Sequence, residues 1–202
     1  MFQGQGIACD RGERRIFSDL DFSIAPGGAM VLRGPNGSGK TSFLRIAATL
    51  LGAADGRLLW NGSEILADIE KHHTRLHFVG HQDAVKGALS VWENVAVWAD
   101  IRGAGDRCVD AALAAFEISH LADTPAQYLS AGQHRRVALA RLVASPAALW
   151  LLDEPTVSLD AEGTACLRRV IADHRAARGM VMAATHIDLG LDDVELLHLK
   201  LP

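Results

Sequence analysis

One glycine-rich stretch has the residue types and the spacing of a phosphate-binding loop. It fits the pattern G-x-x-x-x-G-K-[ST] at every fixed position with Gly34, Pro35, Asn36, Gly37, Ser38, Gly39, Lys40 and Thr41. Glycines at this spacing let backbone N–H groups turn inward toward phosphate oxygens, and the helix expected from Thr41 adds a positive dipole end. The Lys40 ammonium can reach the outer phosphates, and the Thr41 hydroxyl can bind Mg²⁺. The sequence therefore predicts a nucleotide site here.

A pair of acidic residues follows a second apolar run much later in the chain. Residues 148–152 are continuously apolar, as in a buried parallel strand, and Asp153 and Glu154 come directly after them. The Asp153 carboxylate can hold Mg²⁺, directly or through water. Glu154 can act as a general base toward the attacking water, a role that contributes about 10²–10⁴-fold to a rate. Such a pair can also end a strand on a plain surface, and the phosphate loop favours the catalytic interpretation.

A second candidate phosphate site is the start of the helix expected after Leu129. Ser130 is suited to cap this helix, and Gly132 would let a ligand approach its first N–H groups. An ordinary capped helix has the same residues, so this stretch indicates a phosphate site only in combination with the phosphate loop and the acidic pair. One chain that carries two half-sites indicates a dimer in which each copy completes the site of the other.

The elements that must position these residues are predicted by hydrophobic periodicity. We expect strands at residues 6–9, 20–24, 29–32, 56–60, 76–80, 148–152 and 180–184. The first three indicate a small mixed sheet ahead of the loop. Residues 83–145 are predicted to be mostly helical, with a capping box at Ser90 and Glu93 and a helix over 106–118. The fold class is therefore α/β, one domain over residues 1–202, with a core of residues 1–82 and 146–202 that the helical part interrupts.

Composition excludes several classes of protein. The chain has 202 residues, of which 49% are hydrophobic, so a packed core is expected. A net charge of −4 gives no general attraction to nucleic acid, and we predict no nucleic acid partner. We see no signal peptide and no apolar run of membrane-spanning length, so a partner would have to hold the chain at a membrane. A reducing compartment suits the three separated cysteines, Cys9, Cys108 and Cys166.

The three stretches, in this order, resemble the ATP-binding subunits of ABC transporters. The loop is similar to Walker A, residues 151–155 are similar to Walker B, and residues 129–133 are similar to the LSGGQ signature, with Ala131 in place of its first glycine. Matches to the Q-loop glutamine, the D-loop and the switch histidine are Gln82, residues 158–160 and His186. The resemblance covers nearly the whole chain. It implies a P-loop NTPase of the ABC cassette type, with a RecA-like core, an N-terminal antiparallel β subdomain and a helical subdomain.

The resemblance also implies a role for each matching residue. Two chains would pack head to tail, with each ATP between the loop of one copy and the signature of the other. Glu154 and His186 would be catalytic, and Mg²⁺ would be held by Thr41, Gln82 and Asp153. Gln82 would also report to a membrane partner. The implied ATP-binding residues are 34–41 together with Ser42, Arg11, Gln82, Ser130, Ala131, Gly132, Gln133 and Asp160, of which Asp160 would act across the dimer.

Arg11 marks a departure from the family pattern. The family has an aromatic residue at about this position, in the turn after the first strand, and that residue stacks on adenine. A guanidinium can also stack on the face of a base, so Arg11 is a candidate for this role. A plain solvated arginine is the alternative, and adenine recognition is the part of the site that the sequence supports least.

Finer features resemble the ATP-binding subunit of the cytochrome c maturation (haem exporter) system, notably residues 60–62, 80–82, 85–86, 89–94, 129–133 and 135–136. This resemblance implies a pair of subunits on integral membrane transporter subunits, at the cytoplasmic side of a bacterial inner membrane. ATP hydrolysis would support haem export or the release of a haem-loaded chaperone. The alternatives are another ABC transporter and a soluble ABC ATPase of iron–sulfur cluster assembly. A small-molecule kinase shares the loop but has no use for residues 129–133.

Four histidines cluster in the sequence, and a metal or haem site could be read into them. On one helix His73, His77 and His81 would share a face, but residues 76–80 are predicted to form a strand, which separates them. We therefore expect solvated histidines at these positions and at His72, with His81 shaping the Q-loop, and no direct haem ligation. We expect core packing for Trp98 and contact with a partner's coupling helix for Trp92.

Overall fold

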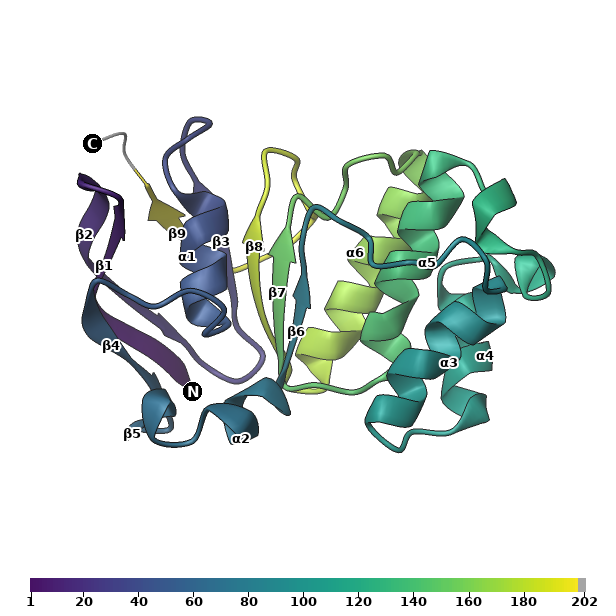
Figure 1. Cartoon of the computed structure of the whole chain (residues 1–202), viewed down its shortest axis with the longest axis horizontal. Helices are drawn as coiled ribbons and strands as arrows, with labels where there is room; N and C mark the ends of the chain where they lie inside the picture. Colours follow the sequence, from purple (N-terminus) through teal and green to yellow (C-terminus); the bar gives the residue numbers. More distant parts are fainter. Residues whose placement is uncertain (200–202) are drawn as a thin grey trace.

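The computed structural model describes residues 1–199, and its strands form two sheets (Figure 1). The first sheet is antiparallel with the order β2-β1-β4-β5. Its strands are β1 (Phe2–Arg11), β2 (Arg14–Ile24), β4 (Asp55–Trp60) and β5 (Ser63–Glu64). The second sheet is parallel with the order β6-β7-β8-β3-β9. Its strands are β3 (Ala29–Arg33), β6 (Leu76–Val79), β7 (Leu149–Asp153), β8 (Met180–Ala184) and β9 (Val194–His198).

The helices cover both faces of the parallel sheet (Figure 1). They are α1 (Lys40–Ala47), α2 (Ile69–His73), α3 (Val91–Ile101), α4 (Asp106–Ala115), α5 (Ala131–Ala144) and α6 (Ala161–Ala176). Helix α1 lies on one face, toward the antiparallel sheet, and α5 and α6 lie on the other, with α3 and α4 outermost. Within residues 1–199 no helix has the length and apolar character needed to cross a membrane.

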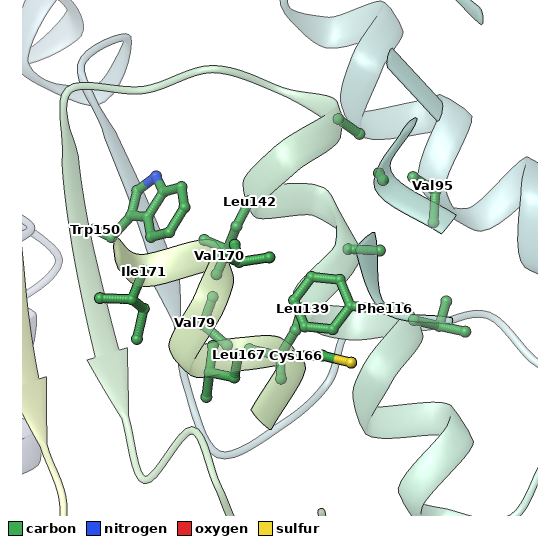
Figure 2. Close-up of a cluster of buried hydrophobic side chains, with 14 of the residues drawn as sticks. Val79, Val95, Phe116, Leu139, Leu142, Trp150, Cys166, Leu167, Val170 and Ile171 are labelled. Atoms are coloured by element: carbon green, nitrogen blue, oxygen red, sulfur yellow. The ribbon is translucent and has the colours of Figure 1, made fainter. Parts of the chain in front are cut away.

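Strand residues of the parallel sheet point alternately into two hydrophobic clusters. Trp150 and Leu152 join the cluster under α5 and α6, whereas Leu149 and Leu151 join the cluster around α1. Figure 2 shows the first cluster, where Trp150 lies near Leu142 of α5 and Val170 of α6. Because both faces are covered, every residue of β7 is buried, which explains its continuously apolar sequence.

The parallel sheet brings the candidate residues to one edge. All five strands run in the same direction, so their carboxyl ends meet there. The phosphate loop follows β3, Asp153 ends β7, and His186 comes two residues after β8. The carboxyl edge of an open parallel sheet is the usual place for a ligand.

Several predictions from the pattern are confirmed, and others are wrong. The capping box at Ser90 and Glu93 is present at the start of α3. The small mixed sheet ahead of the loop is wrong, because residues 29–33 pair with β8 and β9 in the parallel sheet and leave an antiparallel sheet behind. The helix from Asp106 ends at Ala115 and not at 118, since Glu117 adopts a left-handed φ of 59° that a helix does not continue.

The expectation of solvated histidines is wrong at two positions. His72 is 0% exposed and its Nε2 lies 2.9 Å from the Ala47 carbonyl oxygen. His77 is 4% exposed and bonds to the Ser145 carbonyl oxygen, and burial lowers its pKa to about 4. A neutral imidazole with one backbone partner packs as a core residue, which the polarity of histidine hides in a sequence. His73 and His81 are exposed as expected.

The two tryptophans are both half-buried. Trp98 packs its ring edge toward His77 and carries the Arg141 guanidinium 4.7 Å from the ring centroid, so it borders the core without entering it. Trp92 packs against the helical cluster and donates its indole N–H to Asp110 at 3.2 Å.

Candidate functional site

The phosphate loop connects β3 to α1, and its shape requires glycine at two positions. Gly39 has φ of 95° and forms the N-cap of α1. A Cβ atom there would lie 2.7 Å from the Ile16 side chain, closer than real contacts allow. A Cβ atom on Gly34 would lie 2.3 Å from the Leu199 carbonyl oxygen. Small residues at these positions therefore let the loop pass between α1, β2 and the segment after β9.

The Lys40 side chain is held at the loop. It is 9% exposed, and its ammonium donates hydrogen bonds to the carbonyl oxygens of Gly34 at 2.8 Å and Pro35 at 3.2 Å. The Ser38 hydroxyl beside it is fully buried and has no hydrogen-bond partner among residues 1–199. A cation and an unpaired hydroxyl inside a curve of backbone provide donors for an anionic ligand.

Two side chains that could hold a cation meet at the carboxyl edge. The Thr41 hydroxyl donates to the Asp153 carboxylate at 2.8 Å, which connects the start of α1 to the end of β7. Hydroxyl and carboxylate oxygens are ligands that Mg²⁺ accepts, so this pair fits the ion. Nearby, Arg11 donates from Nη2 to the Ser42 hydroxyl at 3.1 Å, which directs an exposed arginine of β1 toward the loop.

These groups line one cavity of ≈ 300 Å³. Its lining residues are Arg11, Ile16, Asn36, Gly37, Gly39, Lys40, Thr41, Ser42, Asp153 and Glu154. Ile16 was not predicted; it lies on β2, five residues beyond Arg11, and gives the cavity an apolar wall. Cation, hydroxyl, carboxylate and apolar wall thus meet in one place, although their residues span more than half of the chain.

Glu154 lies in a strained turn at the end of β7. Its φ is 45°, a left-handed conformation that costs a residue with a side chain roughly 1–3 kcal/mol. Its backbone N–H donates to the Ala184 carbonyl oxygen at 2.8 Å, and its carboxylate lies 3.6 Å from Nε2 of His186. The turn therefore directs the carboxylate to the side where β8 ends, next to the cavity that it lines.

The signature stretch forms the start of α5. Ser130 is the N-cap, its hydroxyl accepts the Gln133 N–H at 3.2 Å, and the Gln133 side chain accepts the Ser130 N–H at 2.9 Å. Ala131 begins the helix, and a Cβ atom on Gly132 would lie 3.1 Å from the Ser158 carbonyl oxygen. The cap that the sequence predicts is confirmed. Ser130, Gly132 and Gln133 line a different cavity, of ≈ 270 Å³, which shares no lining residue with the first.

Two further candidates lie outside the first cavity. Gln82 is exposed, three residues after the end of β6, and lines neither cavity. Asp160 caps α6 by accepting the Gly163 N–H at 2.8 Å, and it lines the signature cavity. The Arg136 guanidinium bonds to Asp160 at 2.8 Å and lowers the pKa of that carboxyl.

The fold and the two nucleotide motifs define an ATPase of the ATP-binding cassette class. The model of the ABC transporter family matches residues 17–157. A cytochrome c biogenesis ATP-binding export protein CcmA from Rhodospirillum rubrum is 54% identical, over 98% of this chain and 85% of that protein. The protein of the same name from Paramagnetospirillum magneticum is 50% identical, over 98% and 93%. The chain belongs to the ABC transporter family and, within it, to the cytochrome c biogenesis ATP-binding export proteins.

Solved structures agree with this fold. An ATP-binding subunit of an ABC transporter superposes with a TM-score of 0.87 at 18% identity, over 99% of this chain and 87% of that one. A dimeric ATP-binding cassette in a post-hydrolysis state with ADP and Pi superposes with a TM-score of 0.85 at 21% identity, over 100% and 96%. The predicted fold class, an α/β cassette with an antiparallel sheet beside a parallel one, is therefore confirmed.

Proposed function

We propose that the chain is the ATP-hydrolysing subunit of an ABC transporter complex for c-type cytochrome biogenesis. The observation that carries this proposal is the 54% identity, over 98% of the chain, to a protein named for that process. The cavity that joins Lys40, Thr41, Asp153 and Glu154 supports hydrolysis as the chemistry. Hydrolysis would be coupled to haem export or to the release of a haem-loaded chaperone.

In the proposed mechanism the loop binds the triphosphate of ATP. The N–H groups of residues 36–42 would surround the phosphates, and the Lys40 ammonium would leave its two carbonyl partners for the outer phosphate oxygens. Thr41 and Asp153 would hold Mg²⁺, with Gln82 joining them when its loop moves toward the cavity. When bound, Mg²⁺ neutralises charge on the transferred phosphoryl group. Arg11 would stack on the adenine.

Glu154 would act on the attacking water. Its carboxylate accepts a proton from the water as the water oxygen bonds to the γ-phosphorus and the bond to the bridging oxygen breaks, so that ADP leaves with that oxygen; this is general base catalysis. His186, 3.6 Å away, would contact the γ-phosphate and hold the water in line with Glu154. A left-handed turn fixes the direction of this carboxylate, and a fixed base loses little entropy when it reacts.

We also propose a head-to-tail homodimer. One chain separates its two half-sites into cavities with no common residue, so each needs the other from a second copy. Ser130, Ala131, Gly132 and Gln133 of one copy would close over the ATP of the other, with Asp160 acting across the dimer. The dimeric cassette with a TM-score of 0.85 is consistent with this arrangement.

Membrane association would come from partner subunits. The proposed site of action is the cytoplasmic side of a bacterial inner membrane, where the pair would be a peripheral part of the complex with integral membrane transporter subunits. We propose that residues 83–145, which hold α3, α4 and α5, form a helical subdomain on a core of residues 1–82 and 146–202. Gln82 is the last core residue before this helical part of the chain, and it would report nucleotide binding to the membrane partner.

The test is genetic and biochemical together. The gene is deleted in its own bacterium and replaced by the wild-type chain or by Glu154→Gln, and covalently bound haem in c-type cytochromes is stained. Wild type should restore the cytochromes, and Glu154→Gln should not. Normal cytochromes in the deletion strain would overturn the proposal. Purification with soluble partners alone, when neighbouring genes are co-expressed, would instead favour iron–sulfur cluster assembly.

A further inference from the structure

One buried arginine connects three parts of the candidate site without touching the nucleotide cavity. Arg135 lies in the second turn of α5, two residues beyond Gln133, and is 3% exposed. It does not line the cavity at the phosphate loop. All three of its guanidinium nitrogens donate to groups of other segments, and a buried guanidinium needs such partners.

One side of this guanidinium holds the turn that carries Glu154. Nε donates to the Pro155 carbonyl oxygen at 3.2 Å, and Nη2 donates to the Glu154 carbonyl oxygen at 3.0 Å and to that of Asp153 at 3.5 Å. Three consecutive carbonyl groups therefore converge on one cation. Since Glu154 has a left-handed φ, these bonds stabilise a backbone conformation that the residue would not adopt alone.

The other side holds the segment around Gln82. Nη1 donates to the Gly80 carbonyl oxygen at 3.2 Å and to the Asp83 carboxylate, so both flanks of Gln82 are fixed. Asp83 also lies 3.1 Å from Nδ1 of His134, the neighbour of Arg135 on α5. The start of α5 is thus bonded to the segment after β6 and to the segment after β7.

We propose that Arg135 is a positioning residue that couples the signature end of α5 to the Glu154 turn and to the Gln82 segment of the same chain. When nucleotide held between two copies shifts the start of α5, Arg135 moves the Glu154 backbone with it. Nucleotide bound in the partner's site, next to the signature of one chain, thereby changes the position of Glu154 in that chain's own site. This inference rests on the proposed function, because it needs Glu154 as the base.

A second buried arginine on the same helix provides the matched control. Arg141 is also 3% exposed, and it donates to one carbonyl oxygen, that of Phe78, at 3.0 Å. Its guanidinium lies over the Trp98 ring, and it lines neither the cavity at the phosphate loop nor the signature cavity. Lysine keeps the charge and the stem of arginine but cannot donate in three fixed directions, so Arg→Lys removes the geometry and leaves the cation.

The experiment compares Arg135→Lys with Arg141→Lys in the full chain. Steady-state kcat and KM for Mg-ATP, equilibrium ATP binding and thermal stability are measured for both. Arg135→Lys should lower kcat on the order of 10–100-fold while KM and ATP affinity stay within about threefold, because only the placement of the base changes. Arg141→Lys should keep kcat within about twofold at a similar loss of stability. Equal kcat in the two variants would overturn the proposal.

A second variant protects the test against misfolding of Arg135→Lys. Asp83→Asn removes the charge that faces Nη1 of Arg135 and Nδ1 of His134 at a half-buried position, and it leaves the bonds of Arg135 to the Glu154 turn in place. Arg135→Lys and Asp83→Asn are then combined in a double-mutant cycle. The fold-loss of kcat in the double variant should be smaller than the product of the two single fold-losses, since both substitutions interrupt the same set of hydrogen bonds. Additive effects would count against the coupling. If Glu154→Gln keeps normal turnover, the proposed function fails first; if only Glu154→Gln loses turnover, the inference alone fails.

Discussion

Two helix starts in this chain could bind phosphate, and they are built differently. Helix α1 has Gly39 as its N-cap, and no side chain bonds to its first N–H groups. Helix α5 has Ser130 as its N-cap, with a reciprocal pair of hydrogen bonds to Gln133. The first N–H groups of α1 are therefore free for a ligand, whereas those of α5 are partly satisfied within the chain. Of the two, only α1 is prepared to bind an anion alone.

The side chains around the two helix starts also differ, and they too favour ligand binding at α1. The start of α1 is surrounded by chemistry from the carboxyl edge of the sheet: Asp153 bonds to Thr41, and Glu154 lines the same cavity. The start of α5 faces a cavity in which Arg136 already pairs with Asp160 and Glu162. We therefore propose that catalysis takes place at the start of α1, and that the start of α5 adds stabilisation when a second copy supplies it to an occupied site.

The largest expected effect is that of Glu154→Gln, which changes the chemistry and leaves the cavity in place. Loss of the base should lower turnover by about 10²–10⁴-fold, while ATP affinity stays near that of the wild type. Bound ATP that cannot be hydrolysed should then hold the dimer together. Turnover is measured by phosphate release and the dimer by size-exclusion chromatography with ATP. Near-normal hydrolysis would remove Glu154 from the mechanism.

The next effect is that of Lys40→Ala, which acts on binding at α1. A lost hydrogen bond to a charged group is worth about 1.5–3 kcal/mol, so ATP affinity should fall about 10–100-fold. Isothermal titration calorimetry with Mg-ATP checks this. Arg45→Ala is the control, because Arg45 is exposed in the last turn of the same helix and should leave the affinity unchanged. Unchanged affinity in Lys40→Ala would exclude the loop as the triphosphate site.

The sequence predicts only part of this difference between the starts of α1 and α5. The loop, its strand and its helix were predicted, because their signals are local: fixed glycines, an apolar run and helical periodicity. The meeting of Thr41 with Asp153 could be inferred from the rule that parallel strands end at one edge. By contrast β9 was missed, since three of its five residues are exposed and the strand with which it pairs in the described part of the chain, β3, is far away in the sequence.

The parts that the sequence could not give depend on tertiary contacts. His77 is buried, and the carbonyl oxygen that bonds to its imidazole belongs to Ser145, 68 positions away. Arg135 makes its hydrogen bonds to segments that are distant in the sequence. A single arginine next to a signature motif does not predict those contacts. A polar residue is expected outside by default, so buried polar residues with distant partners are where composition and periodicity fail.

A smaller effect, and a sharper test of the comparison, comes from two equivalent capping boxes. Ser130→Ala and Ser90→Ala each remove a cap from a helix with the same reciprocal bonds. Each should cost about 1 kcal/mol of stability, or roughly 2–4 °C in Tm. Ser130→Ala alone should also lower turnover, by about tenfold, because it removes a donor to ATP in the dimer. Thermal melts and phosphate release separate the two losses, and equal turnover in both variants would leave Ser130 as a structural cap only.

The smallest expected effect concerns Arg11, where stacking on adenine competes with a plain solvated role. A cation on an aromatic face at an exposed site is worth about 0.5–1 kcal/mol, so Arg11→Ala should weaken ATP binding by about two- to fivefold. Arg14→Ala is the control, because Arg14 lies opposite Arg11 across β1 and β2 and is also exposed. Binding of inorganic tripolyphosphate, which has no base, separates the causes. If Arg11→Ala weakens tripolyphosphate as much as ATP, the arginine serves the loop through its bond to Ser42 and not the adenine. If Arg11→Ala weakens the binding of ATP alone, the site at the start of α1 also recognises the adenine base and not only the phosphates.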